Sequence, residues 1–123
     1  MIDLCDAFLA MPEAVDPAPI VRFMTDSPEV RVVLAPHTDG VATGDAIPKW
    51  ASSMLFAGYI AGNVRTQLVA GKAEDSPVGG YRGVLSVYRA LQPKGLSIAA
   101  IDELDAAERD GGLDAWVAAR LGA

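Results

Sequence analysis

The sequence is poor in the residues from which catalytic and metal sites are usually built. Its 123 residues include one histidine, His37, and one cysteine, Cys5. A single cysteine excludes a disulfide within the chain, and structural zinc sites need four Cys or His ligands at short spacings. No basic residue or histidine lies next to Cys5 to activate its thiol as a nucleophile. We therefore predict no metal and no cofactor.

Long apolar runs and a basic surplus are also missing. Residues 50–64 form an uncharged stretch of 15 residues that still contains polar side chains, whereas a membrane-spanning helix needs about 20 apolar residues. The first residues carry acids where a signal peptide carries bases. A net charge of −6 argues against general binding to phosphate backbones. We expect a cytoplasmic protein that binds neither membranes nor nucleic acid.

The charges are divided unevenly along the chain. Residues 1–48 contain eight acids and two bases, residues 49–96 two acids and six bases, and residues 97–123 six acids and two bases. One prediction is that a basic middle section pairs with two acidic flanks inside the fold. The alternative is a basic groove for an anionic ligand, because a cluster of positive side chains attracts negatively charged molecules.

The segment from Pro48 to Gly71 is predicted to be a helix that is apolar on nearly every face. A helix of this kind has to lie inside the fold. Gly58 and Gly62 lie one turn apart and should let another helix approach closely. Arg65 is the one charge within the apolar part of the helix, so it needs a carboxylate or a route to water. We considered Asp102, Glu103 and Asp105 as its partners, and also a ligand.

Shorter amphipathic segments surround this helix. Helices are expected over about 3–11, 17–26, 81–92 and 97–110, with a last one from 113. Residues 30–34 suit a helix or a strand, and we favour a helix because Ser27-Pro28 is a good start signal. Residues 36–47 have no periodicity and are expected to form a loop. The predicted fold is all-α: one domain, 1–123, as an orthogonal bundle of five to seven helices.

Few residues suggest a ligand site. His37 and Asp39 bring a base and a carboxylate together in the 36–47 loop, either as a general base with its orienting acid or as exposed loop residues. Arg82, in the run Gly79-Gly80-Tyr81-Arg82-Gly83, faces an anion or simply follows a flexible joint. Together with Arg65, these side chains are the candidate ligand-binding residues. No residue is predicted to be catalytic.

Two functions fit the sequence. The absence of a catalytic constellation and the generous apolar content, 51% of residues, favour a non-catalytic module that binds a protein partner or a second copy of itself. The alternative is a small-molecule-binding protein or an enzyme whose site is formed by the 36–47 loop and the central helix. The alternative requires a concave pocket beside His37 or Arg65.

Overall fold

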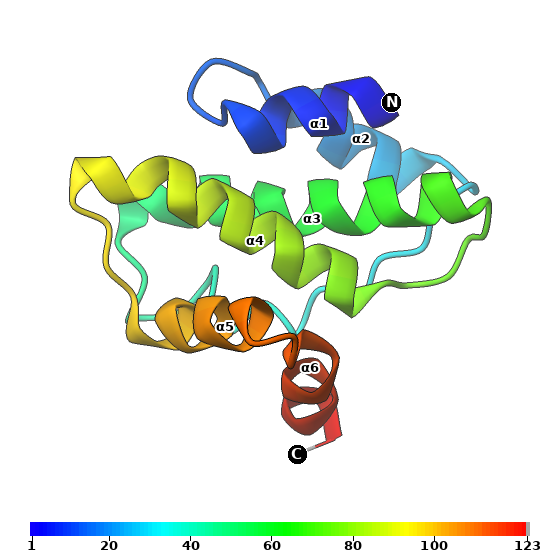
Figure 1. The fold of residues 1–123 in the computed structure, drawn as a ribbon. Coiled ribbons are helices and arrows are strands. Elements are labelled where there is room, and N and C mark those ends of the chain that lie inside the picture. The colour runs from blue at the N-terminus through cyan, green and yellow to red at the C-terminus, as the bar shows by residue number, and fades with distance from the viewer. Residues whose placement is uncertain (123) are drawn as a thin grey trace.

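Six α-helices and one short 3₁₀ turn make up the fold in the computed structural model, which describes residues 1–122 (Figure 1). The helices are α1 (Ile2–Ala10), α2 (Ala18–Asp26), α3 (Lys49–Ala70), α4 (Pro77–Leu91), α5 (Ala99–Arg109) and α6 (Leu113–Gly122), and the 3₁₀ turn η1 (Gln92–Lys94) follows α4. No strand occurs in these residues. The prediction of an all-α bundle built around residues 48–71 is confirmed.

The helix α3 lies in the middle of the bundle. The helices α1 and α2 cover α3 on one side, and α4 crosses α3. The helices α5 and α6 lie beyond α4, on the side away from α1 and α2 (Figure 1). Pro48 precedes the first turn of α3, and Gly71 ends α3 with a left-handed backbone conformation at φ 68°. Gly71 is the terminating residue predicted from the sequence, since glycine enters this conformation without strain.

Glycines set the distance between α3 and α4. A Cβ atom on Gly58 would lie 2.7 Å from Cγ2 of Val87 and 2.9 Å from the carbonyl oxygen of Gly83. A Cβ on Gly62 would overlap the carbonyl oxygen of Gly79. The prediction that Gly58 and Gly62 touch another helix is therefore confirmed. Both helices carry a Gly-x-x-x-Gly pair at the crossing, which brings the two backbones into direct contact.

The helix α4 begins at Pro77, four residues before the predicted start at Tyr81. Ser76 caps it, because the Ser76 hydroxyl accepts a hydrogen bond from the backbone N–H of Gly79 at 3.2 Å. Proline then occupies the first helical position, where its missing N–H costs nothing. Gly79 and Gly80 are thus part of the helix, and the interpretation of this run as a flexible joint is wrong.

Residues 30–34 form neither a helix nor a strand, which corrects our preference for a helix. The segment is held in place by side chains of α3 and of the α3–α4 loop. Gln67 bonds to the backbone of Arg31, and the Asp75 carboxylate accepts a hydrogen bond from the N–H of Val33 at 3.1 Å. Because side chains satisfy these backbone groups, the segment needs no secondary structure of its own.

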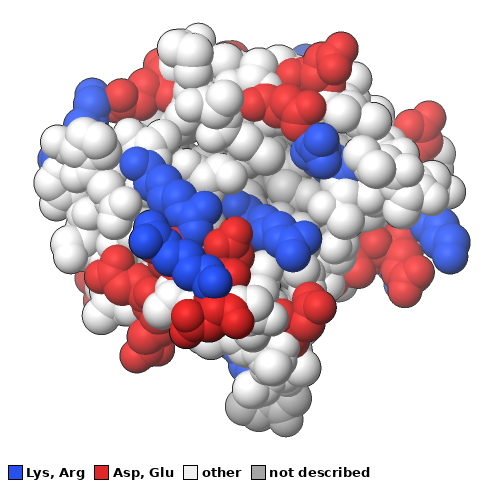
Figure 2. Space-filling model, in the orientation of Figure 1, with Lys and Arg blue, Asp and Glu red and all other residues white. Residues whose placement is uncertain are grey.

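Ion pairs join the basic middle section to both acidic flanks. Arg65 pairs with Asp6 of α1, Lys94 pairs with Glu13 at 2.6 Å, and Arg89 pairs with Asp105 and Glu108 of α5. Figure 2 shows Lys and Arg gathered on the face over α4 and α5 with Asp and Glu directly against them. The first of our two charge predictions describes these contacts.

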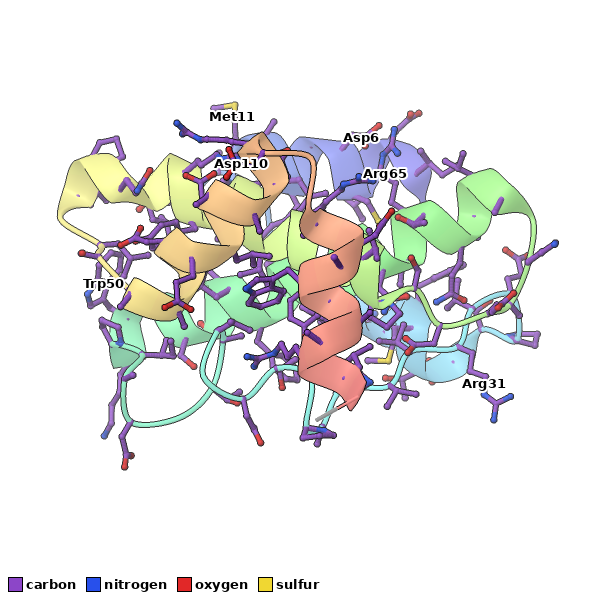
Figure 3. The ribbon with its side chains drawn as sticks, turned by 60° about the horizontal axis from the view of Figure 1, so that its bottom comes forward. Asp6, Met11, Arg31, Trp50, Arg65 and Asp110 are labelled. Atoms are coloured by element: carbon purple, nitrogen blue, oxygen red, sulfur yellow. The ribbon has the colours of Figure 1, made fainter. Side chains whose placement is uncertain are left out.

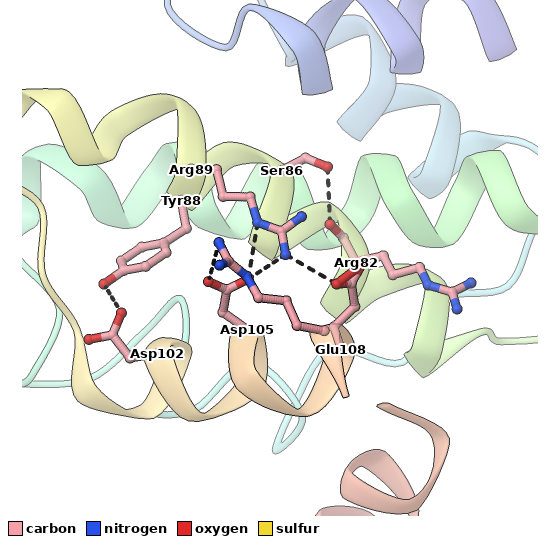
Figure 4. A network of polar contacts seen from close by, with 8 residues as sticks. Arg82, Ser86, Tyr88, Arg89, Asp102, Asp105 and Glu108 are labelled. Atoms are coloured by element: carbon pink, nitrogen blue, oxygen red, sulfur yellow. Dashed lines mark hydrogen bonds and ion pairs between the residues drawn. The ribbon is translucent and has the colours of Figure 1, made fainter. Parts of the chain in front are cut away.

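The α4–α5 contact is the densest of these polar networks (Figure 4). Asp105 also accepts a hydrogen bond from Arg109 at 3.3 Å, and the Tyr88 hydroxyl donates to Asp102 at 2.7 Å. Hydrogen bonds from Arg89 hold the pKa of the Asp105 carboxyl below its ordinary value. Asp102 and Asp105 thus bond to side chains of α4, and Glu103, the third acid that we considered for Arg65, is exposed on α5. Arg65 pairs with Asp6 of α1 instead.

No helix within residues 1–122 combines the length and the apolar character that crossing a membrane requires.

Candidate functional site

A groove of about 850 Å³ lies between α2 and α3. One wall comes from the start of α2 and the other from the first half of α3, and Thr43 of the 36–47 loop also lines the groove. The lining residues are Asp16, Pro17, Ala18, Val21, Arg22, Thr43, Lys49, Ser52, Ser53, Phe56 and Ala57. The volume lies in the range of ligand-binding sites in proteins.

Helical periodicity explains which side chains reach the groove. On α3, the groove residues follow the spacing i, i+3, i+4, i+7 from Lys49 to Phe56, which places them on one face. On α2, Ala18, Val21 and Arg22 follow the same pattern over one turn. The groove therefore lies where one face of each helix is left without a covering element.

The 36–47 loop is tied to the groove by hydroxyl groups. The Ser52 hydroxyl donates to the carbonyl of Ala42 at 2.7 Å, and the Thr43 hydroxyl donates to the Asp39 carboxylate at 3.0 Å. Asp16, on the opposite wall, accepts a hydrogen bond from the N–H of Ala18 at 3.0 Å and so caps α2. Three polar side chains that line the groove, Asp16, Thr43 and Ser52, thus form hydrogen bonds within the fold.

Two basic side chains of the groove remain unpaired. Arg22 and Lys49 lie on opposite walls and are exposed, and neither forms an ion pair or a side-chain hydrogen bond within the described residues. The floor between them is apolar, with Val21, Phe56 and Ala57. The groove thus combines an apolar floor with cations on both rims.

Neither His37 nor Asp39 lines this groove, although the Asp39 carboxylate is bonded to the groove residue Thr43. Together with Pro36, Arg120 and Leu121, His37 lines a small pocket of about 220 Å³. Its ring Nδ1 is buried without a hydrogen-bond partner in residues 1–122. The two side chains form no hydrogen bond with each other, since the Asp39 carboxylate is bound to Thr43. A general base with an orienting carboxylate is therefore not assembled here.

Arg65 and Arg82 lie on other surfaces. Arg65 reaches from α3 to Asp6 of α1, as Figure 3 shows, and the two side chains are 42% and 48% exposed. Arg82 is exposed on α4, and its side chain has no ion pair in the part of the chain that the structure describes. The four candidate residues thus do not share one pocket, and neither arginine lines the groove.

An aromatic cluster that the sequence analysis did not identify joins α3, α4 and α6. The rings of Tyr59 and Trp116 both meet the Tyr81 ring edge-on, with centroids 5.3 Å apart in each pair. Arg120 lies over the Tyr81 and Trp116 rings and donates to the Tyr81 hydroxyl at 2.9 Å. That hydroxyl donates to the carbonyl of His37 at 2.7 Å. Burial raises the pKa of Tyr81, so it stays a neutral donor.

Other reactive groups are absent or inactive. Cys5 is fully buried, and burial raises the pKa of its thiol to about 11, so it is protonated at neutral pH and is a poor nucleophile. No group of three or more His, Cys, Asp or Glu side chains suited to a metal ion occurs in residues 1–122.

Comparison of the chain with models of known families, with curated proteins and with solved structures finds no match. The groove therefore has to be interpreted from its own residues.

Proposed function

We propose that this protein is a non-catalytic interaction module and that the groove between α2 and α3 binds a segment of a partner protein. The observation that carries the proposal is the apolar floor of this groove, formed by Val21, Phe56 and Ala57. When a partner covers an apolar surface that is open to water, the free energy of the system falls, and this favours binding.

An exposed aromatic side chain next to the groove supports the same proposal. Trp50 follows Lys49 in the first turn of α3 and is 47% exposed (Figure 3). Tryptophan is enriched among the residues that dominate binding energy in protein interfaces. The groove is lined by hydroxyls, two bases, one carboxylate and apolar groups, and within the described residues neither base forms a hydrogen bond with a hydroxyl. This composition favours binding over catalysis.

Site-directed photo-cross-linking in cells of the source organism tests the proposal. A photoreactive phenylalanine derivative replaces Ser53, which is exposed in the groove, and in a matched control it replaces Glu103, which is exposed on α5. We expect a discrete cross-linked protein from position 53 only, and its yield should fall when Phe56→Ala truncates the floor. Equal products from both positions, or none from position 53, would contradict the proposal. A product of twice the chain's mass would identify a second copy as the partner.

A further inference from the structure

We infer that the segment bound in the groove is an amphipathic helix whose polar face is acidic. This inference rests on the proposed function and adds the chemistry of the partner. It follows from the two unpaired cations on the rims and from the nature of the walls.

Two basic side chains without an ion pair line the groove. The chain has 16 acidic and 10 basic side chains, and Arg65, Arg89 and Lys94 each pair with a carboxylate of another segment. Within the described residues six of the bases form no ion pair, and two of these six, Arg22 and Lys49, line the groove. A groove with an apolar floor and a free cation on each wall is complementary to a ligand with an apolar face and acidic edges.

The carboxylate on the rim cancels only part of this charge. Asp16 lines the groove and keeps its negative charge while it accepts a hydrogen bond from the N–H of Ala18, so one of the two positive charges remains. The first turn of α3 adds to the positive potential, because Pro48 supplies no capping side chain. The positive end of a helix of 22 residues therefore lies beside Lys49. Together these groups make the groove a locally positive surface on a protein of net charge −6.

The walls favour a helix over an extended peptide. Both walls are helices, and a helix has no strand edge with which an extended segment could pair. Affinity must then come from side chains in an apolar groove, which is how amphipathic helices bind. Ala18 and Ala57 are small and let such a helix approach closely.

Binding of three designed helical peptides to the full chain tests the inference. They share leucines at positions i, i+3, i+4 and i+7, and their flanking positions carry Glu, Gln or Lys. In fluorescence anisotropy at low salt, we expect the Glu peptide to bind best and the Lys peptide to bind least. Arg22→Glu and Lys49→Glu should each lower the affinity for the Glu peptide by about fivefold, and the double variant should bind the Lys peptide more tightly than the Glu peptide. Arg82→Glu, which changes an exposed and unpaired arginine outside the groove, should have no effect.

The outcomes separate this inference from the proposed function. Equal affinity for the Glu and Gln peptides, with both weakened by Phe56→Ala, would overturn the acidic partner and leave the interaction module intact. No binding of any peptide up to about 1 mM would overturn the inference, and the cross-linking at position 53 would then decide the proposed function alone. Tighter binding of an oligothymidylate than of the Glu peptide would overturn it in favour of nucleic acid. A dimer in light scattering that Arg22→Glu dissociates would overturn it in favour of a second copy.

Discussion

The side-chain amide of Gln67 bonds to the backbone of Arg31 in both directions. Its oxygen accepts a hydrogen bond from the Arg31 N–H at 2.8 Å, and its nitrogen donates to the Arg31 carbonyl at 2.8 Å. Gln67 is buried, and its nitrogen also donates to the Asn63 side chain at 2.6 Å. One glutamine of α3 thus supplies the donor and the acceptor that a neighbouring β-strand would supply to an extended segment.

Replacing this glutamine should loosen the 30–34 segment. The variant Gln67→Ala removes both hydrogen bonds to Arg31, and we expect the free energy of unfolding to fall by about 2 kcal/mol, at about 1 kcal/mol for each bond. Urea denaturation measures this change. Val69→Ala, at an exposed position of the same helix, is the control and should change stability by less than about 0.5 kcal/mol. Equal stability of the two variants would show that the amide does not hold the segment.

The glycines of the α3–α4 crossing should tolerate no side chain. A Cβ on Gly83 would overlap the carbonyl oxygen of Gly58 and lie 3.0 Å from the Cα of Gly62. Both obstacles are backbone atoms, so only separation of the helices makes room. We expect Gly83→Ala to lower the free energy of unfolding by about 3 kcal/mol or more, measured by thermal and urea denaturation.

Gly112→Ala is the matched control for this substitution. A Cβ at Gly112 would lie 3.6 Å from the nearest atom, the carbonyl oxygen of Ala107, which is an ordinary contact. The loss of stability should therefore be confined to Gly83. A Gly83→Ala variant as stable as Gly112→Ala would contradict the close backbone contact between α3 and α4.

Sequence reasoning was most successful where local chemistry decides the structure. The helix from Lys49 to Ala70 and its end at Gly71 follow from composition and from the backbone freedom of glycine. The pair Gly58 and Gly62 indicated a close helix contact because glycine within a helix costs about 1 kcal/mol unless packing compensates for it.

Long-range partners were not accessible in the same way. The cost of an unpaired buried charge predicted that Arg65 would reach a carboxylate or water. The side chain does both, since it is 42% exposed, but its partner is Asp6, 59 positions away, and the acids that we named lie on α5. Residues 30–34 were misassigned because their partner, Gln67, lies 36 positions away. The groove has no motif of its own, since its residues are separated in sequence and share a surface only through the packing of α2 against α3.

Arg120 should fasten α6 to the rest of the fold. Its guanidinium donates to the Tyr81 hydroxyl and to the carbonyl of Asp39, and it lies over the Trp116 ring. In Arg120→Ala, we expect faster amide hydrogen exchange in α6 and in residues 36–40. The free energy of global unfolding should fall by about 1 kcal/mol. Trp116 fluorescence, read in a Trp50→Phe background, should report a more polar environment.

Exchange elsewhere gives the control for Arg120. The amides of α3 should keep their protection, because the helix is buried independently of α6. Arg82→Ala, which removes an exposed arginine from α4, should leave exchange in α6 unchanged. If Arg120→Ala also leaves the exchange in α6 unchanged, Arg120 does not hold α6 to the rest of the fold.

Acid should weaken the contact between α4 and α5 through Asp105. Arg89, by hydrogen bonding, and Arg109 hold the pKa of this carboxyl below its ordinary value in the folded protein, and its side chain is 14% exposed. The unfolded chain therefore takes up the proton first as the pH falls below about 4. The stabilisation from Asp105 is complete above that pH and is lost as the pH falls through the lower, folded-state pKa.

Comparison of Asp105→Asn with the unmodified protein measures this effect. At neutral pH the variant should be about 1 kcal/mol less stable, and the difference should shrink as the pH falls from about 5 to about 2. Glu103→Gln, at an exposed position two residues away, should change the free energy of unfolding by a small amount that does not depend on pH. Urea denaturation at a series of pH values distinguishes the two patterns. A constant difference for Asp105→Asn would mean that its carboxylate is not stabilised by Arg89, and the α4–α5 contact would then depend on its apolar side chains alone.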